Sequence, residues 1–146
     1  MAAPAQEHFD LQRFMDAQDQ VYRQVCSQLR AGRKTSHWMW FVFPQIHGLG
    51  RSATAVQYAI SSMAEAQAYL DHPILGPRLR ECTELASSHG ERTAHAIFGT
   101  PDDMKFHSCM TLFARCKGNI AVFDRALAIF FGGVPDAATE AILRSP

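Results

Sequence analysis

The apolar residues of this 146-residue chain recur at spacings of three and four over most of its length. From Leu11 to about Leu29 they place one apolar face along a helix that Asp10 can cap and Gly32 ends. Similar patterns, with capping residues or proline at their starts and glycine near their ends, predict seven further helices. Their expected ranges are about 53–60, 63–70, 75–89, 93–98, 101–117, 120–131 and 137–143.

One stretch breaks this pattern. Residues from Trp38 to Phe43 are apolar on every side, so neither a helical period nor a strand alternation can be read from them. Pro44 disfavours helical dihedral angles at Phe43, so the segment ends there, whether it is a short helix or an extended piece. We therefore predict a single all-α domain, residues 1–146, of seven or eight short helices around a central aromatic segment, with residues 1–9 as a flexible terminus.

Composition narrows the class of partner. Hydrophobic residues make up 47% of the chain and its formal net charge is zero. The first value is typical of a packed domain, and the second argues against duplex nucleic acid or an anionic membrane as a partner. No apolar run approaches the roughly 20 residues of a membrane span, and the N-terminal residues lack a signal-peptide pattern. We expect a cytoplasmic protein.

The four cysteines, Cys26, Cys82, Cys109 and Cys116, show no C-x-x-C or other spacing of a metal site. Cys26 lies on the apolar stripe of the first helix. In a cytosolic protein such residues are typically buried, reduced thiols. We expect neither a metal nor a cofactor.

The polar half of the central stretch contains the pattern G-x-G-x-x-A, from Gly48 through Gly50 to Ala53. A dinucleotide site needs a strand directly before these glycines, whereas Pro44 and the helical remainder argue against one. Two readings remain. Gly48, Gly50, Arg51 and Ser52 form an anion seat at a helix start, or the glycines only form a turn and Ser52 only caps.

The neighbouring residues extend the first reading into a candidate ligand site. Trp38 and Trp40 could form an aromatic wall, although an unbroken apolar run is typical of a core. Gln45 and His47 would supply polar contacts, and Lys105 a second cation. The ligand would be a small anionic or nucleotide-like molecule.

Several short motifs resemble a bacterial family of unknown function, whose members are small all-helical proteins. These motifs are His37-Trp38-Met39-Trp40, Phe43-Pro44-Gln45, Gly48-Leu49-Gly50, Tyr58-Ala59-Ile60, Ala68-Tyr69-Leu70, His72-Pro73, Leu75-Gly76-Pro77-Arg78-Leu79, Ile97-Phe98-Gly99 and the run from Lys105 to Phe113. The resemblance covers about residues 8 to 130. It implies the all-α fold and no activity. Some members carry the label calpastatin, but calpastatins are disordered inhibitors and this composition is that of a packed domain.

The chain is also faintly similar to the NADAR, or YbiA-like, proteins, which hydrolyse N-glycosidic bonds of phosphoribosyl or ADP-ribosyl compounds. Gln57 and Lys105-Phe106 would be the matching residues. The acidic residue that this group has four positions before the glutamine falls on Ala53 here.

Two functions follow as hypotheses. The first is a binder of a nucleotide or ribose-phosphate-like molecule, with or without N-glycosidic hydrolysis. The second is a non-enzymatic interaction module or homodimer with no small-molecule site.

Overall fold

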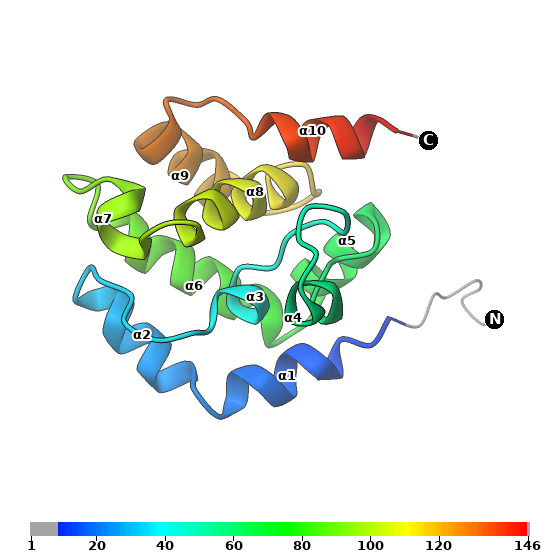
Figure 1. Cartoon of the computed structure of the whole chain (residues 1–146), viewed down its shortest axis with the longest axis horizontal. Coiled ribbons are helices and arrows are strands. Elements are labelled where there is room, and N and C mark those ends of the chain that lie inside the picture. Colours follow the sequence, from blue (N-terminus) through cyan, green and yellow to red (C-terminus); the bar gives the residue numbers. More distant parts are fainter. Residues whose placement is uncertain (1–8, 146) are drawn as a thin grey trace.

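The computed structural model describes residues 9–145, so residues 1–8 of the predicted flexible terminus lie outside the described range. Within that range the chain folds into ten helices and no strand, which confirms the all-α prediction (Figure 1). The helices are α1 (Gln12–Asp19), α2 (Tyr22–Arg30), α3 (Met39–Val42), α4 (Ala53–Gln57), α5 (Met63–Asp71), α6 (Leu75–Ser87), α7 (Ala94–Phe98), α8 (Asp102–Phe113), α9 (Ala121–Phe131) and α10 (Ala137–Arg144). None of the described helices is long and apolar enough to cross a bilayer.

The single helix predicted from Leu11 to Leu29 is wrong, because the chain bends between α1 and α2. The apolar spacing of three and four is interrupted at Gln18 and Asp19, where the next apolar position would fall. Gln18 is nevertheless buried, since its amide nitrogen donates to Phe41 O at 2.7 Å and to the Tyr69 hydroxyl at 2.9 Å. The bend lets α1 pack on α3 while α2 packs on α6.

The aromatic stretch contains the short helix α3, and its apolar half belongs to the core. Trp38, Met39, Val42 and Phe43 are all buried. The Phe43 ring meets the rings of Phe98 and Phe106 edge to face, with centroid distances of 5.8 and 5.1 Å. The prediction that helices pack around a central aromatic segment therefore agrees with the structure.

Gln28 on α2 fixes the chain that leads into α3. Its side-chain oxygen accepts from Thr35 N at 2.9 Å, Ser36 N at 3.3 Å and Trp38 Nε1 at 2.8 Å. Its amide nitrogen donates to Ser36 Oγ at 2.7 Å. One side chain thus satisfies the indole nitrogen of a buried tryptophan and two backbone amides.

We expect Gln28→Ala to lower the free energy of unfolding by about 1–3 kcal/mol, because the buried Trp38 N–H would lose its acceptor. Urea unfolding followed by circular dichroism measures this change. Gln24→Ala is the matched control, since Gln24 is an exposed glutamine one turn earlier on α2. Equal stability of the two variants would contradict the role assigned to Gln28.

Two helices, α6 and α8, pack against most of the other helices. In Figure 1, α1 and α2 run along one edge and α10 along the opposite edge, with α6 and α8 between them. The helix α6 packs against α2, α5 and α9, and α8 packs against α5, α7, α9 and α10. This arrangement brings three segments together: the loop after α3, the start of α8 and the start of α10.

Candidate functional site

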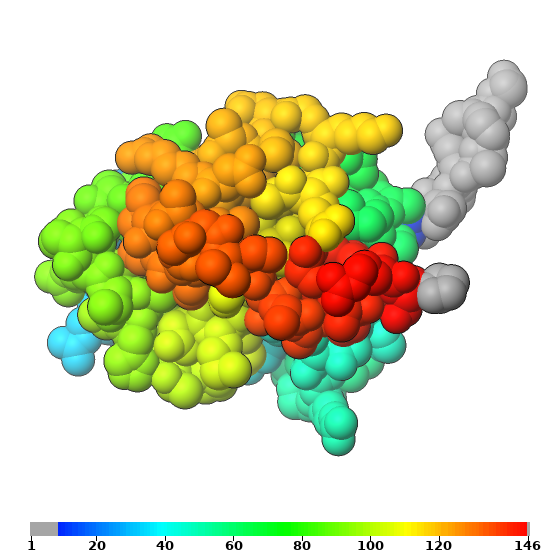
Figure 2. Space-filling view, turned by 90° about the horizontal axis from the view of Figure 1, so that it is seen from above, coloured from blue at the N-terminus to red at the C-terminus, as the bar shows by residue number. Residues whose placement is uncertain are grey.

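A hollow of about 300 Å³ lies where these three segments meet. Its lining is mostly apolar, with an amide, an ammonium, a hydroxyl and a carboxylate among the side chains. The lining residues are Gln45, Leu49, Gly50, Pro101, Met104, Lys105, Ser108, Asp136 and Ala138. In Figure 2 the teal loop, the yellow-green start of α8 and the orange-red start of α10 adjoin one another. We call this hollow the Lys105 pocket.

The loop that supplies Gln45 is held in place by backbone pairing. Ile46 and Ile60 form an isolated parallel bridge, in which His47 N donates to Ile60 O and Ile60 N donates to Gln45 O, both at 2.8 Å. Gly50 then passes close to α4, where an added Cβ would come within 2.6 Å of the Ala55 Cβ. The backbone of Gln45 is therefore fixed at the edge of the pocket that this residue lines.

Lys105 belongs to a small charge cluster at the start of α8. Its Nζ lies 3.6 Å from Asp102 Oδ1 and 4.8 Å from the centroid of the Trp40 ring. The other oxygen of Asp102, Oδ2, is 2.6 Å from the Nζ of Lys34. Two ammonium groups thus share the carboxylate of Asp102.

Asp136 supplies the carboxylate of the pocket and also caps α10. Its Oδ2 accepts from Thr139 N at 3.0 Å, from Thr139 Oγ1 at 2.6 Å and from Ser108 Oγ at 3.1 Å. These bonds join the start of α10 to α8. They engage Oδ2, and the second oxygen is available as an acceptor for a bound hydroxyl or amine.

The structure places Trp38 away from the pocket, which corrects its predicted role as a wall. Trp38 is only 1% exposed and bonds to Gln28, so its ring belongs to the core. Trp40 is half-buried and lines a narrow space beside Gln45 and Gly50. That space measures about 10 Å³, which holds about one water molecule at most. The Trp40 ring therefore contacts Lys105, and this space has no room for a base stacked on the ring.

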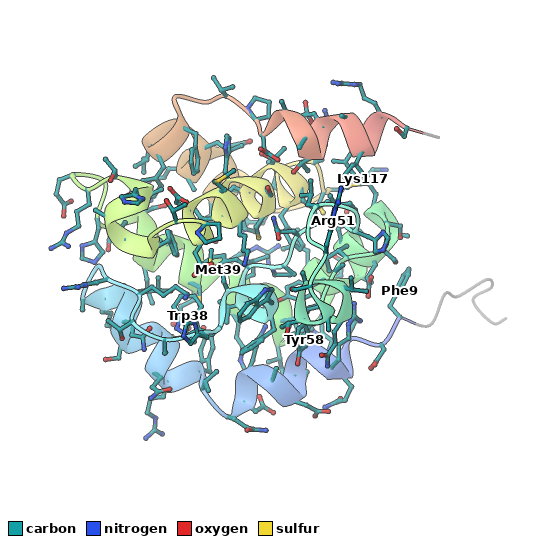
Figure 3. All side chains as sticks on the ribbon, in the orientation of Figure 1. Phe9, Trp38, Met39, Arg51, Tyr58 and Lys117 are labelled. Atoms are coloured by element: carbon teal, nitrogen blue, oxygen red, sulfur yellow. The ribbon has the colours of Figure 1, made fainter. Side chains whose placement is uncertain are left out.

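Of the predicted anion seat, Gly50 lines this pocket, whereas Gly48, Arg51 and Ser52 do not. Arg51 is exposed, and Figure 3 shows it well apart from Trp38, the other end of the predicted site. Ser52 caps α4 by accepting from Ala55 N at 3.1 Å. Since α4 has only five residues, its dipole adds little attraction for an anion.

The remaining predicted residues divide between two surfaces. Gln45, Gly50 and Lys105 come together in the Lys105 pocket. His47 instead lines a separate hollow of about 400 Å³ beside α10. Gly48 adopts a φ of +108°, a value that residues other than glycine rarely take. It lies next to the side chain of Ile142.

Sequence reasoning missed Ser108 and Asp136 as members of the pocket. Asp136 was predicted as the start of a helix, and its cap geometry confirms that. The local sequence pattern does not indicate that α10 crosses α8. The contact between Ser108 and Asp136, which are 28 positions apart, was therefore not predictable from it.

Comparisons with known proteins agree with the fold and give a family. The family described as "Protein of unknown function (DUF1810)" matches residues 8–143. The crystal structure of the conserved hypothetical protein Rv1873 from Mycobacterium tuberculosis is similar over 94% of this chain and 99% of that chain, with 55% identity and a TM-score of 0.92. None of the curated proteins matches. The chain therefore belongs to the DUF1810 family of proteins of unknown function.

Proposed function

We propose that the protein binds a small phosphorylated, ribose-like molecule, such as a pentose phosphate or a mononucleotide, in the Lys105 pocket. The observation that carries this proposal is an ammonium group in the pocket lining, that of Lys105, whose acidic partner Asp102 is shared with Lys34. Asp102 lies between the ammonium groups of Lys34 and Lys105, so its single negative charge does not neutralise both. A lysine in this situation favours a second anion, and phosphate is a common one.

The other polar groups fit the rest of such a ligand. Asp136 can accept hydrogen bonds from sugar hydroxyls with its free oxygen, and the Gln45 amide can both donate and accept. Leu49, Pro101 and Met104 offer apolar contact to a sugar ring or base. An apolar hollow with a few convergent polar groups is the usual form of a small-molecule site.

Pocket size favours a small ligand over a dinucleotide. The volume of about 300 Å³ lies at the lower end of the range of about 300–1,000 Å³ that is usual for ligand pockets. We therefore expect a pentose phosphate or mononucleotide to fit inside the pocket, and ADP-ribose to extend beyond it.

We assign binding rather than N-glycosidic hydrolysis to this site. Among the described residues that line the pocket, Asp136 is the one carboxylate, and it is also the cap of α10. Glycoside-cleaving enzymes commonly use two carboxylates with separate roles. Gln57, the residue matched to the NADAR proteins, is exposed, and its carbonyl oxygen accepts from Arg13 Nε at 2.8 Å.

A small-molecule site is also preferred to an interaction module. The large apolar side chains exposed in the described part of the chain are Val56, Ile74, Met104 and Val134. They lie on four separate segments, and single exposed apolar residues of this kind are normal for a monomer.

Isothermal titration with a panel of ligands tests the proposal. The panel is ribose 5-phosphate, AMP, ADP-ribose, ribose and inorganic phosphate. We expect saturable binding of ribose 5-phosphate or AMP, and weaker binding of ribose and of phosphate alone. Absence of saturable heat with every phosphorylated member would overturn the proposal.

Within this proposal, Gln45→Ala should weaken binding of ribose 5-phosphate or AMP roughly 2- to 13-fold, because one hydrogen bond worth about 0.5–1.5 kcal/mol is lost. The backbone atoms of Gln45 that pair with Ile60 remain, so stability should change little. Gln57→Ala is the control, since that exposed glutamine does not line the pocket. Unchanged affinity in Gln45→Ala would place the ligand elsewhere.

A further inference from the structure

A second chemical cluster lies between α2 and α6. Cys26 and Tyr22 are one turn apart on α2, and Glu81 and Cys82 are neighbours on α6. Cys26 Sγ donates to Glu81 Oε1 at 3.9 Å, and Cys82 Sγ donates to the Tyr22 hydroxyl at 3.8 Å. The Tyr22 hydroxyl in turn donates to the same Glu81 oxygen. These contacts place the thiols of Cys26 and Cys82, from two different helices, in one hydrogen-bond network.

We propose that Cys26 and Cys82 are a peroxide-sensitive thiol pair, which hydrogen peroxide or another small hydroperoxide converts into an intramolecular disulfide. Cys26 would be the residue attacked first and Cys82 the resolving residue. The proposal concerns a modification site on the face opposite to α10 and is independent of the Lys105 pocket.

The surroundings of the two sulfur atoms give them different roles. The neighbouring Cys82 thiol lowers the pKa of Cys26 to about 7, with further help from Tyr22 and from Arg30 and against the opposing effects of burial and Glu81. The same interaction, together with burial, raises the pKa of Cys82 well above its ordinary value. The thiolate is the reactive form of cysteine, so the reactive sulfur at neutral pH is that of Cys26.

Accessibility supports the same order. Cys26 is 5% exposed, whereas Cys82 is fully buried. Cys26 is therefore the less buried of the two residues. A thiolate with a second thiol beside it is the arrangement of a redox-sensing cysteine and its resolving partner.

The chemistry balances with one peroxide molecule per disulfide. The Cys26 thiolate attacks one peroxide oxygen, the O–O bond breaks, and the leaving hydroxide takes up a proton to give water. Cys26 is then a sulfenic acid. The Cys82 sulfur attacks the Cys26 sulfur, the S–O bond breaks, and hydroxide leaves with the thiol proton of Cys82 as a second water. Both sulfur atoms are oxidised by one electron each, and the two peroxide oxygens are reduced.

The other two cysteines provide internal comparisons. Burial raises the pKa of Cys109 well above its ordinary value, and raises that of Cys116 to about 11. All four cysteines are free thiols in this structure. With iodoacetamide at neutral pH, we expect Cys26 to be alkylated at least about 10-fold faster than Cys109 or Cys116, because reaction follows the thiolate fraction.

The deciding experiment treats the reduced full-length chain with hydrogen peroxide and maps its peptides by mass spectrometry without reduction. We expect a loss of two hydrogen atoms that dithiothreitol reverses, and a cross-linked peptide pair containing Cys26 and Cys82. A disulfide between any other pair, or oxidation of Cys26 to a sulfinic acid with Cys82 unmodified, would overturn the proposal, as would the absence of oxidation at Cys26.

Two variants extend this test. Cys82→Ala should abolish the intramolecular disulfide and leave a Cys26 sulfenic acid that dimedone traps. Cys109→Ala, which changes an equally buried cysteine outside the network, should leave the disulfide unchanged. If either alanine variant fails to fold, the wild-type peptide map alone decides between the outcomes.

Discussion

Replacing Phe106 with alanine should lower the free energy of unfolding by about 3–5 kcal/mol, the usual cost of removing a buried phenylalanine ring. Phe106 is fully buried at the centre of an aromatic cluster. Its ring lies at centroid distances of 4.6 Å from Phe98, 5.1 Å from Phe43 and 5.8 Å from Phe130. The substitution removes all three contacts and leaves a cavity between α3, α7, α8 and α9.

Urea unfolding monitored by circular dichroism measures this loss. Met104→Ala is the matched control, since Met104 lies on the same helix two positions earlier and is 64% exposed. We expect Met104→Ala to change stability by no more than about 0.5 kcal/mol, as is usual for surface positions. A small effect of Phe106→Ala would mean that α8 does not carry the centre of the core.

The second large effect concerns ligand affinity. Lys105→Met should weaken binding of ribose 5-phosphate or AMP roughly 10- to 100-fold, because a charged hydrogen bond contributes about 1.5–3 kcal/mol. Methionine keeps most of the apolar stem of the lysine beside Trp40. Asp102 keeps its ion pair with Lys34, so the free energy of unfolding should change by less than about 1 kcal/mol.

Isothermal titration compares this variant with Lys117→Met, which removes an exposed lysine outside the pocket. The control should bind as the wild type does. If both variants bind equally well, the phosphate of the ligand is not held by Lys105.

The helices that local signals mark were predictable from the sequence. Ser52 accepts a backbone N–H three residues later, as expected of a helix cap, and Ser62, Thr93 and Asp136 do the same. The prediction that failed was the single first helix, because the break in it depends on tertiary contacts. Gln18 interrupts the apolar face of the predicted first helix, and its burial depends on Phe41 and Tyr69, which come from distant parts of the sequence.

The candidate site shows the same division. A function in the polar half of the central stretch stays a prediction; the structure shows that Gln45 and Gly50 of that half line one pocket together with Lys105. The roles of Trp38 and Trp40 were harder to predict, because composition alone does not distinguish an aromatic ring in the core from one in the wall of a pocket. Trp38 is held in the core by Gln28, a contact between side chains that no local periodicity reveals.

Asp136 was missed for a related reason. Its local role as a cap is complete without a ligand, so the sequence offered no reason to look further. Only the packing of α10 across α8 brings its carboxylate to the same hollow as Lys105.

The most direct test of the central claim is a titration of the ¹⁵N-labelled protein with AMP, followed by NMR. We predict saturable shifts of the backbone amides of Gln45, Leu49, Lys105 and Ala138, around the Lys105 pocket, with the amides of α2 unmoved. Saturable shifts confined to another surface, or none at all with AMP and with ribose 5-phosphate, would contradict the account.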